Sequence, residues 1–371
     1  METQILTATS LDLPDEAFDD VARALAGGSL VVFPTETVYG VGASAVSADA
    51  MAALSRLKSR TPDKPFTLHL ADPHQAEPFA GPLLPLAKRL ITKTWPGPLT
   101  LIVPDRRRHR HEPKGLIEEA LYHEGTIGLR CPSHPVAQAL LKKAGVPVAA
   151  SSANLGGRPA PHRIEEALAD LRGQVHYAID GGPTPYARAS TVVRIRPDNS
   201  YEILREGAIT ARRLARLAHT RILFVCTGNL CRSPMAKGLL TRMLADHYGC
   251  RPDALEDHGI EIDSAGTGAA SSSPPSPNAV EVMTERGIDI RGECSRPMTV
   301  DALLAADYIW VMTRGHKDTA LRFAPEVAGR VALVDPSSQE VPDPIGGDLE
   351  TYRACARHLE RALTERLTEI V

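Results

Sequence analysis

The sequence has few cysteines, few aromatic residues and little net charge. Its six cysteines form no Cys-x-x-Cys pair, which argues against common zinc sites, and they do not fit a small disulfide framework. No run of about 18 apolar residues occurs, and no basic-then-apolar leader is present, so we expect no membrane span and a cytoplasmic protein. The net charge of −3 gives no global argument for nucleic-acid binding, although local basic patches stay open.

The length of 371 residues predicts two domains, because domains usually run about 100–200 residues. Five of the six cysteines lie after residue 220, which sets the second part apart from the first. Residues 208–220 (AITARRLARLAHT) have a helical pattern and form the join. We therefore expect domains at residues 1–217 and 218–371, both of the α/β class.

The segment from Arg221 to Leu240 (RILFVCTGNLCRSPMAKGLL) predicts a short buried strand, a polar loop and a helix. Ser233 is the expected N-cap residue, with Pro234 in the first turn. Backbone N–H groups of such a loop bind oxyanions, and the same field favours a thiolate at Cys226. Arg232 adds a planar fork for phosphate oxygens. The alternative is a buried structural cysteine beside a surface arginine.

This segment resembles the signature of low-molecular-weight protein tyrosine phosphatases, as do SAGT (264–267), SRPMT (295–299) and Asp343-Pro344. The resemblance implies a four-stranded parallel Rossmann-like sheet with helices on both faces. It implies Cys226 as nucleophile through a phosphocysteine, Arg232 as phosphate ligand, Asp343 as general acid, a phosphoprotein substrate and no cofactor. The other members of the implied phosphate loop are Thr227, Gly228, Asn229, Leu230, Cys231 and Ser233.

The substrate stays open between phosphotyrosine and phosphoarginine. CTGN and DPxGG resemble the bacterial branch that includes protein arginine phosphatases, which favours threonine where this chain has Leu230. An aliphatic residue there resembles the phosphotyrosine enzymes, yet Ile345 replaces the aromatic residue usual after Asp-Pro. Arsenate reduction would need a resolving cysteine pair that the spacing does not supply. We also hypothesise a reversible Cys226–Cys231 disulfide that protects the thiol from overoxidation.

Several motifs of the first part follow predicted strands. PTETVYGVG (34–42) follows the strand 30–33, SSAN (151–154) follows 146–150, and STVV (190–193) and LREG (204–207) come later. LKSRTPDKPF (57–66) concentrates positive charge, which is either an anion cradle or a solvated basic loop. DRRRHRHEPK (105–114) fits no strong ligand pattern for metal or nucleic acid, and we expect a solvated loop.

In this order the motifs resemble the YrdC-like L-threonylcarbamoyladenylate synthase family over residues 5–215, which implies an open twisted α/β sheet around a cleft. Members of the family are nucleotidyltransferases that convert L-threonine, bicarbonate and ATP to threonylcarbamoyl-adenylate and pyrophosphate. The product is used for tRNA threonylcarbamoyladenosine modification. The implied threonine-binding residues are Thr37, His69, Arg130, Ala150 and Ser190. The implied ATP-binding residues are Lys58, Arg60, Lys64, Thr126, Ser152, Asn154 and Arg205.

The resemblance further implies Mg²⁺ on the ATP phosphates with no metal ligand from the protein, a downstream tRNA threonylcarbamoyl transferase complex and contact with tRNA. Ala160, where the family can supply a hydroxyl, and Arg188-Ala189, which replaces Gly-x, depart from the family pattern. The function expected is a bifunctional synthase and phosphatase. The alternatives are a synthase with a non-catalytic phosphate-binding regulatory module, or an RNA-binding first domain fused to an active phosphatase.

Overall fold

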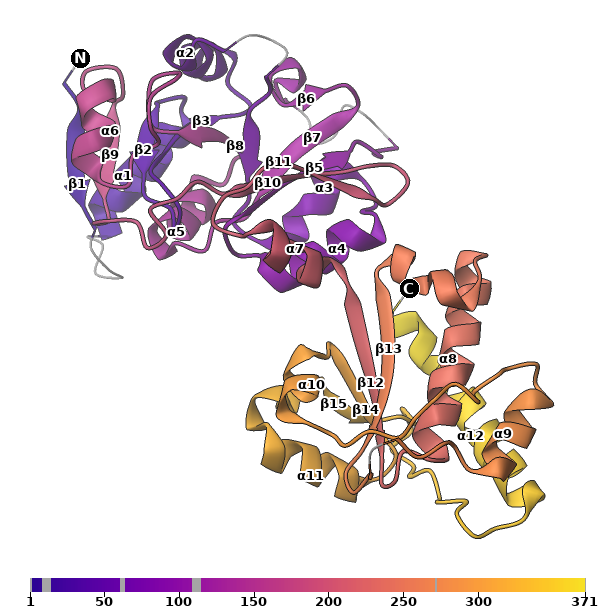
Figure 1. Cartoon of the computed structure of the whole chain (residues 1–371). Helices are drawn as coiled ribbons and strands as arrows, with labels where there is room; N and C mark the ends of the chain where they lie inside the picture. Colours follow the sequence, from indigo (N-terminus) through magenta and orange to yellow (C-terminus); the bar gives the residue numbers. More distant parts are fainter. Residues whose placement is uncertain (1, 9–14, 61–63, 109–114, 271, 371) are drawn as a thin grey trace. The chain divides into compact units, whose positions relative to one another are not determined.

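The computed structural model describes residues 2–8, 15–60, 64–108, 115–270 and 272–370. It divides into two compact units, Met1–Ala218 and His219–Val371, whereas the sequence analysis placed the boundary one residue earlier (Figure 1). Each unit has its own sheet and its own apolar core. Among the described residues, no helix combines the length and the apolar character needed to cross a membrane.

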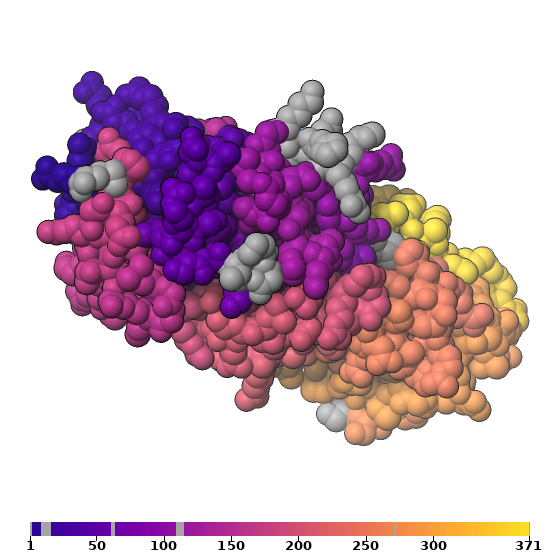
Figure 2. All heavy atoms as spheres, turned by 90° about the horizontal axis from the view of Figure 1, so that it is seen from above, coloured from indigo at the N-terminus to yellow at the C-terminus, as the bar shows by residue number. Residues whose placement is uncertain are grey.

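The first unit is built on a mixed, 11-stranded sheet. Its strands lie in the order β1 (Gln4–Thr7), β9 (Tyr177–Asp180), β2 (Val31–Phe33), β3 (Gly40–Ser44), β8 (Val148–Ser152), β4 (Thr67–His69), β7 (Thr126–Arg130), β5 (Leu99–Pro104), β10 (Thr191–Ile195) and β11 (Tyr201–Arg205), with β6 (Tyr122–His123) paired to β7. The pairing of β1 with β9 joins segments far apart in the chain. In Figure 2 the pink atoms of this later segment lie beside the indigo N-terminal atoms.

Helices pack on both faces of this sheet. One face carries α2 (Ala48–Lys58), α4 (Pro85–Thr94), α6 (Ile164–Leu171) and α7 (Ala211–Ala218), and the other carries α1 (Asp15–Ala26) and α5 (Pro135–Ala144). The short α3 (Ala76–Ala80) also contributes to the first core. The predicted helix at the join is α7, whose Leu214 is buried.

In the first unit, the alternation of side chains along four strands places polar residues around a cavity. Leu68, Leu101, Leu129 and Val193 point into the core with α2 and α4. Because successive side chains of a strand point to opposite faces, their neighbours lie on the face that α1 and α5 share. On β4, β7, β5 and β10 these neighbours line a cavity of about 380 Å³ instead of an apolar core.

The second unit has a four-stranded, all-parallel sheet. Its strands lie in the order β13 (Ile260–Gly266), β12 (Thr220–Cys226), β14 (Tyr308–Val311) and β15 (Val331–Leu333). Figure 1 shows α8 (Arg232–Tyr248), α9 (Pro277–Thr284) and α12 (Leu349–Arg366) on one face, with α10 (Val300–Ala305) and α11 (Arg314–Phe323) on the other. The implied Rossmann-like architecture is therefore present. β12 is central, so its carboxyl end is enclosed by the ends of two neighbouring strands.

One local prediction is wrong. Helix α8 begins at Arg232 with Cys231 as the N-cap residue, so Ser233 lies inside the first turn and does not cap the helix. Its hydroxyl instead contacts the Cys226 sulfur and accepts a hydrogen bond from Asn229. Because the helix begins at Arg232, the side chains of Arg232 and Ser233 lie in its first turn and contact the loop before it.

Candidate functional site

Two candidate sites are present, one in each unit, and the first is built around Cys226. This residue ends β12, which is paired on both sides, and its side chain is 2% exposed. The Cys226 Sγ lies 3.0 Å from the Ser233 Oγ and accepts a hydrogen bond from the Asn229 N–H at 3.3 Å. The Cys226 sulfur is therefore held in place by one hydroxyl and one backbone N–H of the loop.

Asn229 holds the loop in shape. It has a positive φ of 55°, and its side chain donates to the Ser233 and Ser264 hydroxyls at 2.8 and 2.9 Å. Its Oδ1 accepts from the Arg296 N–H at 2.9 Å. A Cβ at Gly266 would come within 2.5 Å of the Thr227 carbonyl, so glycine is needed for this approach. The SAGT and SRPMT motifs therefore support the loop from behind.

Arg232 and Asp343 meet at the opening of this loop. The buried Arg232 guanidinium forms an ion pair with the Asp343 carboxylate, which is 37% exposed. It also donates to the Val341 carbonyl and to the Thr227 hydroxyl, both at 3.2 Å, while its Nε has no hydrogen-bond partner among the described residues. A phosphate that binds at this loop therefore has to displace the Asp343 carboxylate from part of the Arg232 guanidinium.

His316 is a residue that the sequence analysis missed. Its Nε2 lies 2.9 Å from the Thr227 Oγ1, and its Nδ1 lies 2.9 Å from the hydroxyl of Thr313, which caps α11. The imidazole thus links the helix start to the hydroxyl that accepts from Arg232. The T-x-x-H spacing (313–316) at a helix start is the sequence signal that points to it.

Most residues of the implied phosphatase site line one pocket of about 180 Å³, whereas Asn229 and Ser233 lie behind it and contact the Cys226 sulfur. Leu230 and Ile345 add two aliphatic side chains to its wall, and Ile345 is 60% exposed. The pocket is lined by Cys226, Thr227, Gly228, Leu230, Cys231, Arg232, Asp343 and Ile345. Cys231 contacts the Ser276 and Tyr352 hydroxyls at 3.2 and 3.4 Å, and burial raises the pKa of its thiol.

The family resemblance implies Asp343 as the general acid, which predicts that Asp343→Asn lowers kcat on phenyl phosphate by about 10²–10³-fold, because an amide cannot protonate the leaving oxygen. The loss should be much smaller on p-nitrophenyl phosphate, whose leaving group needs little protonation. Steady-state rates on the two esters measure this difference. An equal loss on both would mean that Asp343 serves only to hold Arg232.

The second candidate site is the cavity of the first unit. Most of the predicted residues line it, namely His69, Arg130, Ala150 and Ser190 of the threonine set and Arg60, Lys64, Thr126, Ser152 and Arg205 of the ATP set. Ala160 and Ala189, which depart from the family pattern, line it as well. Thr37, Lys58 and Asn154 do not line the cavity, and each contacts a residue or segment that does.

Arg130 is the main cation at the predicted threonine end. Its Nη2 donates to the Glu36 carboxylate and to the Thr37 hydroxyl, both at 2.7 Å, and Arg130 is 5% exposed. Its Nε is buried without a hydrogen-bond partner among the described residues. Glu36 is also held by the Ser133 N–H at 3.0 Å. Arg130 therefore keeps donor capacity for a carboxylate while Glu36 and Thr37 orient it.

Lys58 supports the SSAN segment from beneath. Its Nζ donates to the Ser152 carbonyl at 2.8 Å and also contacts the Asn154 carbonyl and side-chain oxygen. Burial, followed by the Arg60 charge, lowers the pKa of Lys58 to about 8. In this structure Lys58 thus holds the SSAN segment, and its contact with ATP, which the family resemblance implies, stays a prediction.

Arg60 and Arg205 are two cations at the predicted nucleotide end of the cavity, each held by neighbouring groups. Arg60 lies 4.4 Å from the centre of the Phe66 ring and donates to the Lys64 carbonyl at 3.0 Å. Arg205 donates to the Ser190 carbonyl through Nε and Nη2, at 3.1 and 3.0 Å. Burial lowers the pKa of both, and Arg130 lowers that of Arg205 further. These desolvated cations favour a bound anion.

The described residues contain no cluster of three or more His, Cys, Asp or Glu side chains arranged as metal ligands. Arg60, Lys64, Arg130 and Arg205 line the cavity, and Glu36, beside it, is engaged by Arg130 and Ser133. The donor set therefore suits phosphate oxygens.

Both sites contain a histidine that is buried in the neutral form. Burial, followed by Arg130, lowers the pKa of His69 to about 3, and burial, followed by Arg232, lowers that of His316 to about 4. Below about pH 6.5 both histidines take up a proton in the unfolded chain but stay neutral in the folded chain. The free energy of unfolding should therefore fall as the pH drops toward 4. Each histidine contributes up to about 1.4 kcal/mol per pH unit.

Urea unfolding at pH 7 and pH 4.5 measures this loss. His69→Gln should reduce the difference only in the transition of the first unit, and His316→Gln only in that of the second, so each variant is the control for the other. Unchanged pH differences in both variants would contradict neutral burial.

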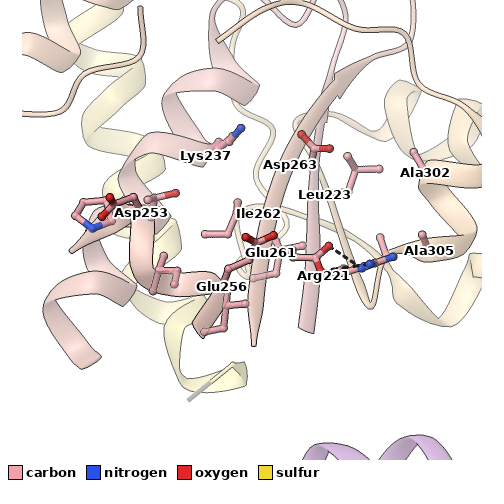
Figure 3. A pocket seen from close by; sticks show the side chains of 16 residues that line it. Arg221, Leu223, Lys237, Asp253, Glu256, Glu261, Ile262, Asp263, Ala302 and Ala305 are labelled. Atoms are coloured by element: carbon pink, nitrogen blue, oxygen red, sulfur yellow. Dashed lines mark hydrogen bonds and ion pairs between the residues drawn. The ribbon is translucent and has the colours of Figure 1, made fainter. Parts of the chain in front are cut away.

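A separate hollow of about 470 Å³ lies at the edge strand β13. Figure 3 shows charged side chains from β12, β13, α8 and the 3-10 turn Pro252–His258 around it. Several of these charges are paired with one another or with neighbours, as in Arg221–Glu261 at 2.8 Å and Arg296–Asp263 at 3.0 Å. The phosphate-loop residues do not line this hollow, so it is distinct from the candidate site.

Family comparison assigns the two units separately. Residues 23–207 match the Sua5, YciO and YrdC family, whose description reads "Telomere recombination". Residues 221–371 match the low molecular weight phosphotyrosine protein phosphatases.

Individual relatives match the first unit. Threonylcarbamoyl-AMP synthase from Bacillus subtilis (strain 168) is 39% identical over 204 residues, which cover 55% of this chain and 57% of the relative. Threonylcarbamoyl-AMP synthase from Chromohalobacter salexigens is 34% identical over 173 residues, which cover 47% of this chain and 89% of the relative. The chain thus spans little more than half the length of the first relative.

Among solved structures, P. abyssi Sua5 complexed with L-threonine has a TM-score of 0.53 at 20% identity and covers 97% of this chain and 98% of its own. At this identity the likeness concerns the fold alone. Taken together with the family matches, the chain belongs to the Sua5/YciO/YrdC family through its first unit and carries a low molecular weight phosphotyrosine protein phosphatase domain as its second.

Proposed function

We propose that the chain is a bifunctional enzyme. Its first unit forms threonylcarbamoyl-adenylate from L-threonine, bicarbonate and ATP, with release of pyrophosphate. Its second unit hydrolyses a phosphate monoester through Cys226. The proposal for the first unit is supported by one cavity that brings the partly engaged Arg130 together with Arg60, Lys64 and Arg205.

In the synthase reaction the chain's residues bind, orient and neutralise charge. Arg130 and Thr37 hold the threonine carboxylate, which leaves the amino group free to take up bicarbonate as a carbamate. Arg60, Lys64 and Arg205 bind the phosphates while a carbamate oxygen attacks the α-phosphorus and pyrophosphate leaves. Mg²⁺ stays an expectation, held by the nucleotide's phosphates, and it would neutralise part of their charge.

Pyrophosphate release tests the first activity. Release that requires both threonine and bicarbonate supports the synthase. ATP-binding without any such release would instead favour the alternative in which the first unit binds RNA and makes no adenylate. We further propose that the product passes to a tRNA threonylcarbamoyl transferase complex in the cytoplasm, with tRNA contact.

The phosphatase proposal is supported by the convergence of Cys226, Arg232 and Asp343 on one small pocket. The thiolate attacks phosphorus, Arg232 and the loop N–H groups bind the non-bridging oxygens, and the leaving oxygen takes a proton from Asp343. Water, activated by the same carboxylate, then hydrolyses the phosphocysteine. A regulatory module without catalysis is the alternative, and it predicts phosphate binding with no turnover.

Matched phosphotyrosine and phosphoarginine peptides test the substrate, with phosphate release as the readout and Cys226→Ser as the control. Preference for phosphotyrosine would mean that the aliphatic Leu230, which resembles the phosphotyrosine enzymes, indicates the substrate. Preference for phosphoarginine would make Leu230 a tolerated variant. Cleavage of an aryl phosphate but of neither peptide would indicate another ester.

The Cys226–Cys231 disulfide remains part of the proposal. Both cysteines are free thiols in the structure and line the same pocket. Peroxide inactivation that dithiothreitol reverses in the wild type but not in Cys231→Ser supports it. Equal recovery of both proteins would remove the hypothesis.

A further inference from the structure

The cavity of the first unit has one cation that neither the motifs nor the family resemblance assigns. On β10, Val193 and Ile195 point into the core, whereas Val192 and Arg194 line the cavity. The Arg194 Nε is buried and has no hydrogen-bond partner among the described residues. Burying an unpaired guanidinium nitrogen is unfavourable, so its retention here points to a partner that arrives from outside the chain.

The strand register places Arg194 between the two predicted substrate ends. Arg194 lies opposite Ile102 on β5, and Ile102 lies opposite Gly128 on β7. Gly128 separates Thr126, predicted to contact the nucleotide, from Arg130, predicted to contact threonine. Two strand spacings, about 10 Å, separate the backbones of β10 and β7, and an arginine side chain extends across most of that span.

Gly128 lines the same cavity as Arg194 and adds no side chain to its wall. A Cβ added there would meet the Thr67 Oγ1 at 3.5 Å and the Ile102 Cγ1 at 4.0 Å, which are ordinary contacts. Packing within the protein therefore does not require glycine. The missing side chain leaves room for a ligand group above β7.

The nearby carboxylates are already engaged. Glu202 lies opposite Arg194 on β11, but its carboxylate accepts from the Arg196 Nη2 at 3.1 Å. Glu36 accepts from Arg130. The other cations of the cavity, Arg60 and Arg205, donate to backbone carbonyls. Among the described residues, no ion pair is formed by Arg194, so it adds uncompensated positive charge to the cavity.

We infer that Arg194 is a further phosphate-binding residue of this cavity, which contacts a phosphate of the bound nucleotide near the point where it meets the carbamate. The inference rests on the proposed synthase function. Its planar fork binds two phosphate oxygens at once, on the opposite side of Gly128 from the SSAN strand. Arg194 and Arg205 then supply cations from the β10–β11 side, and Arg60 and Lys64 supply them from the segment between α2 and β4.

Kinetics of pyrophosphate release by the full chain test this assignment. Arg194→Gln should raise the KM for ATP at least about 10-fold while the KM for threonine stays within about 2-fold. Arg194→Lys keeps the charge but loses the fork and should give an intermediate KM. Arg172→Gln, which changes an exposed arginine outside the cavity, is the matched control and should match the wild type.

Calorimetric titration with ATP and with inorganic pyrophosphate separates this inference from the synthase proposal. Weaker binding of both to Arg194→Gln, in a chain with no threonine-dependent turnover, would uphold the phosphate contact and overturn the synthase. An active enzyme whose Arg194→Gln variant keeps the KM for ATP would overturn the contact alone. A rise confined to the KM for threonine would reassign Arg194 to the amino-acid carboxylate and likewise overturn it.

Discussion

Cys226→Ser should abolish phosphate-ester hydrolysis by the full chain, with a loss of at least about 10⁴-fold in kcat. The sulfur lies at the end of a doubly paired strand, close to the Ser233 hydroxyl and the Asn229 N–H. A serine hydroxyl at the same place keeps the shape but does not ionise at neutral pH, so no nucleophile is available. Release of p-nitrophenol measures the change.

Two controls distinguish a loss of catalysis from a loss of folding in Cys226→Ser. Cys294→Ser changes an exposed cysteine and should keep full phosphatase activity. Pyrophosphate release by Cys226→Ser should equal that of the wild type, because the nucleophile belongs to the second unit. Residual aryl-phosphate turnover above a tenth of the wild-type rate would contradict the covalent mechanism.

Arg60→Ala should lower threonine-dependent pyrophosphate release at least about 100-fold. Arg60 is held over the Phe66 ring and by a backbone carbonyl, so its charge is preorganised in the cavity. An alanine there leaves the departing pyrophosphate without one of its cations. A coupled pyrophosphate assay at saturating threonine and bicarbonate measures the loss.

Arg56→Ala is the matched control, because Arg56 is an exposed arginine on α2, the helix that ends just before Arg60, and lies outside the cavity. Lys58→Ala offers a contrast, since Lys58 does not itself line the cavity and instead supports the Ser152–Asn154 segment from beneath. We expect it to lower thermal stability as well as activity. Arg60→Ala with unchanged turnover would show that the basic loop is only a solvated surface.

Local patterns predicted much of what positions the sites. The strand–loop–helix around Cys226 and the strand 126–130 follow from apolar runs that end in polar residues, and both are present. Ser233 shows the limit of this reasoning. A serine before proline reads as a cap, but the hydroxyl has a closer partner in the Cys226 sulfur, and the helix starts earlier.

Other features depend on contacts between distant segments, which local patterns do not contain. Arg194 faces the cavity because β10 pairs with β5, so its role follows from register across strands. His316 reaches Thr227 across 89 positions of the chain. The pairing of β1 with β9 is equally remote from any local signal. The positions of such residues in a site can be recognised only when the strand pairing and the tertiary contacts are known.

The central claim is that one chain carries two independent active sites. It is tested most directly by measuring pyrophosphate release and p-nitrophenyl phosphate hydrolysis on the same preparations of wild type, Arg60→Ala and Cys226→Ser. We predict that the wild type has both activities, that Arg60→Ala loses only the first and that Cys226→Ser loses only the second. Absence of either activity from the wild type, or loss of both in one folded variant, would contradict it.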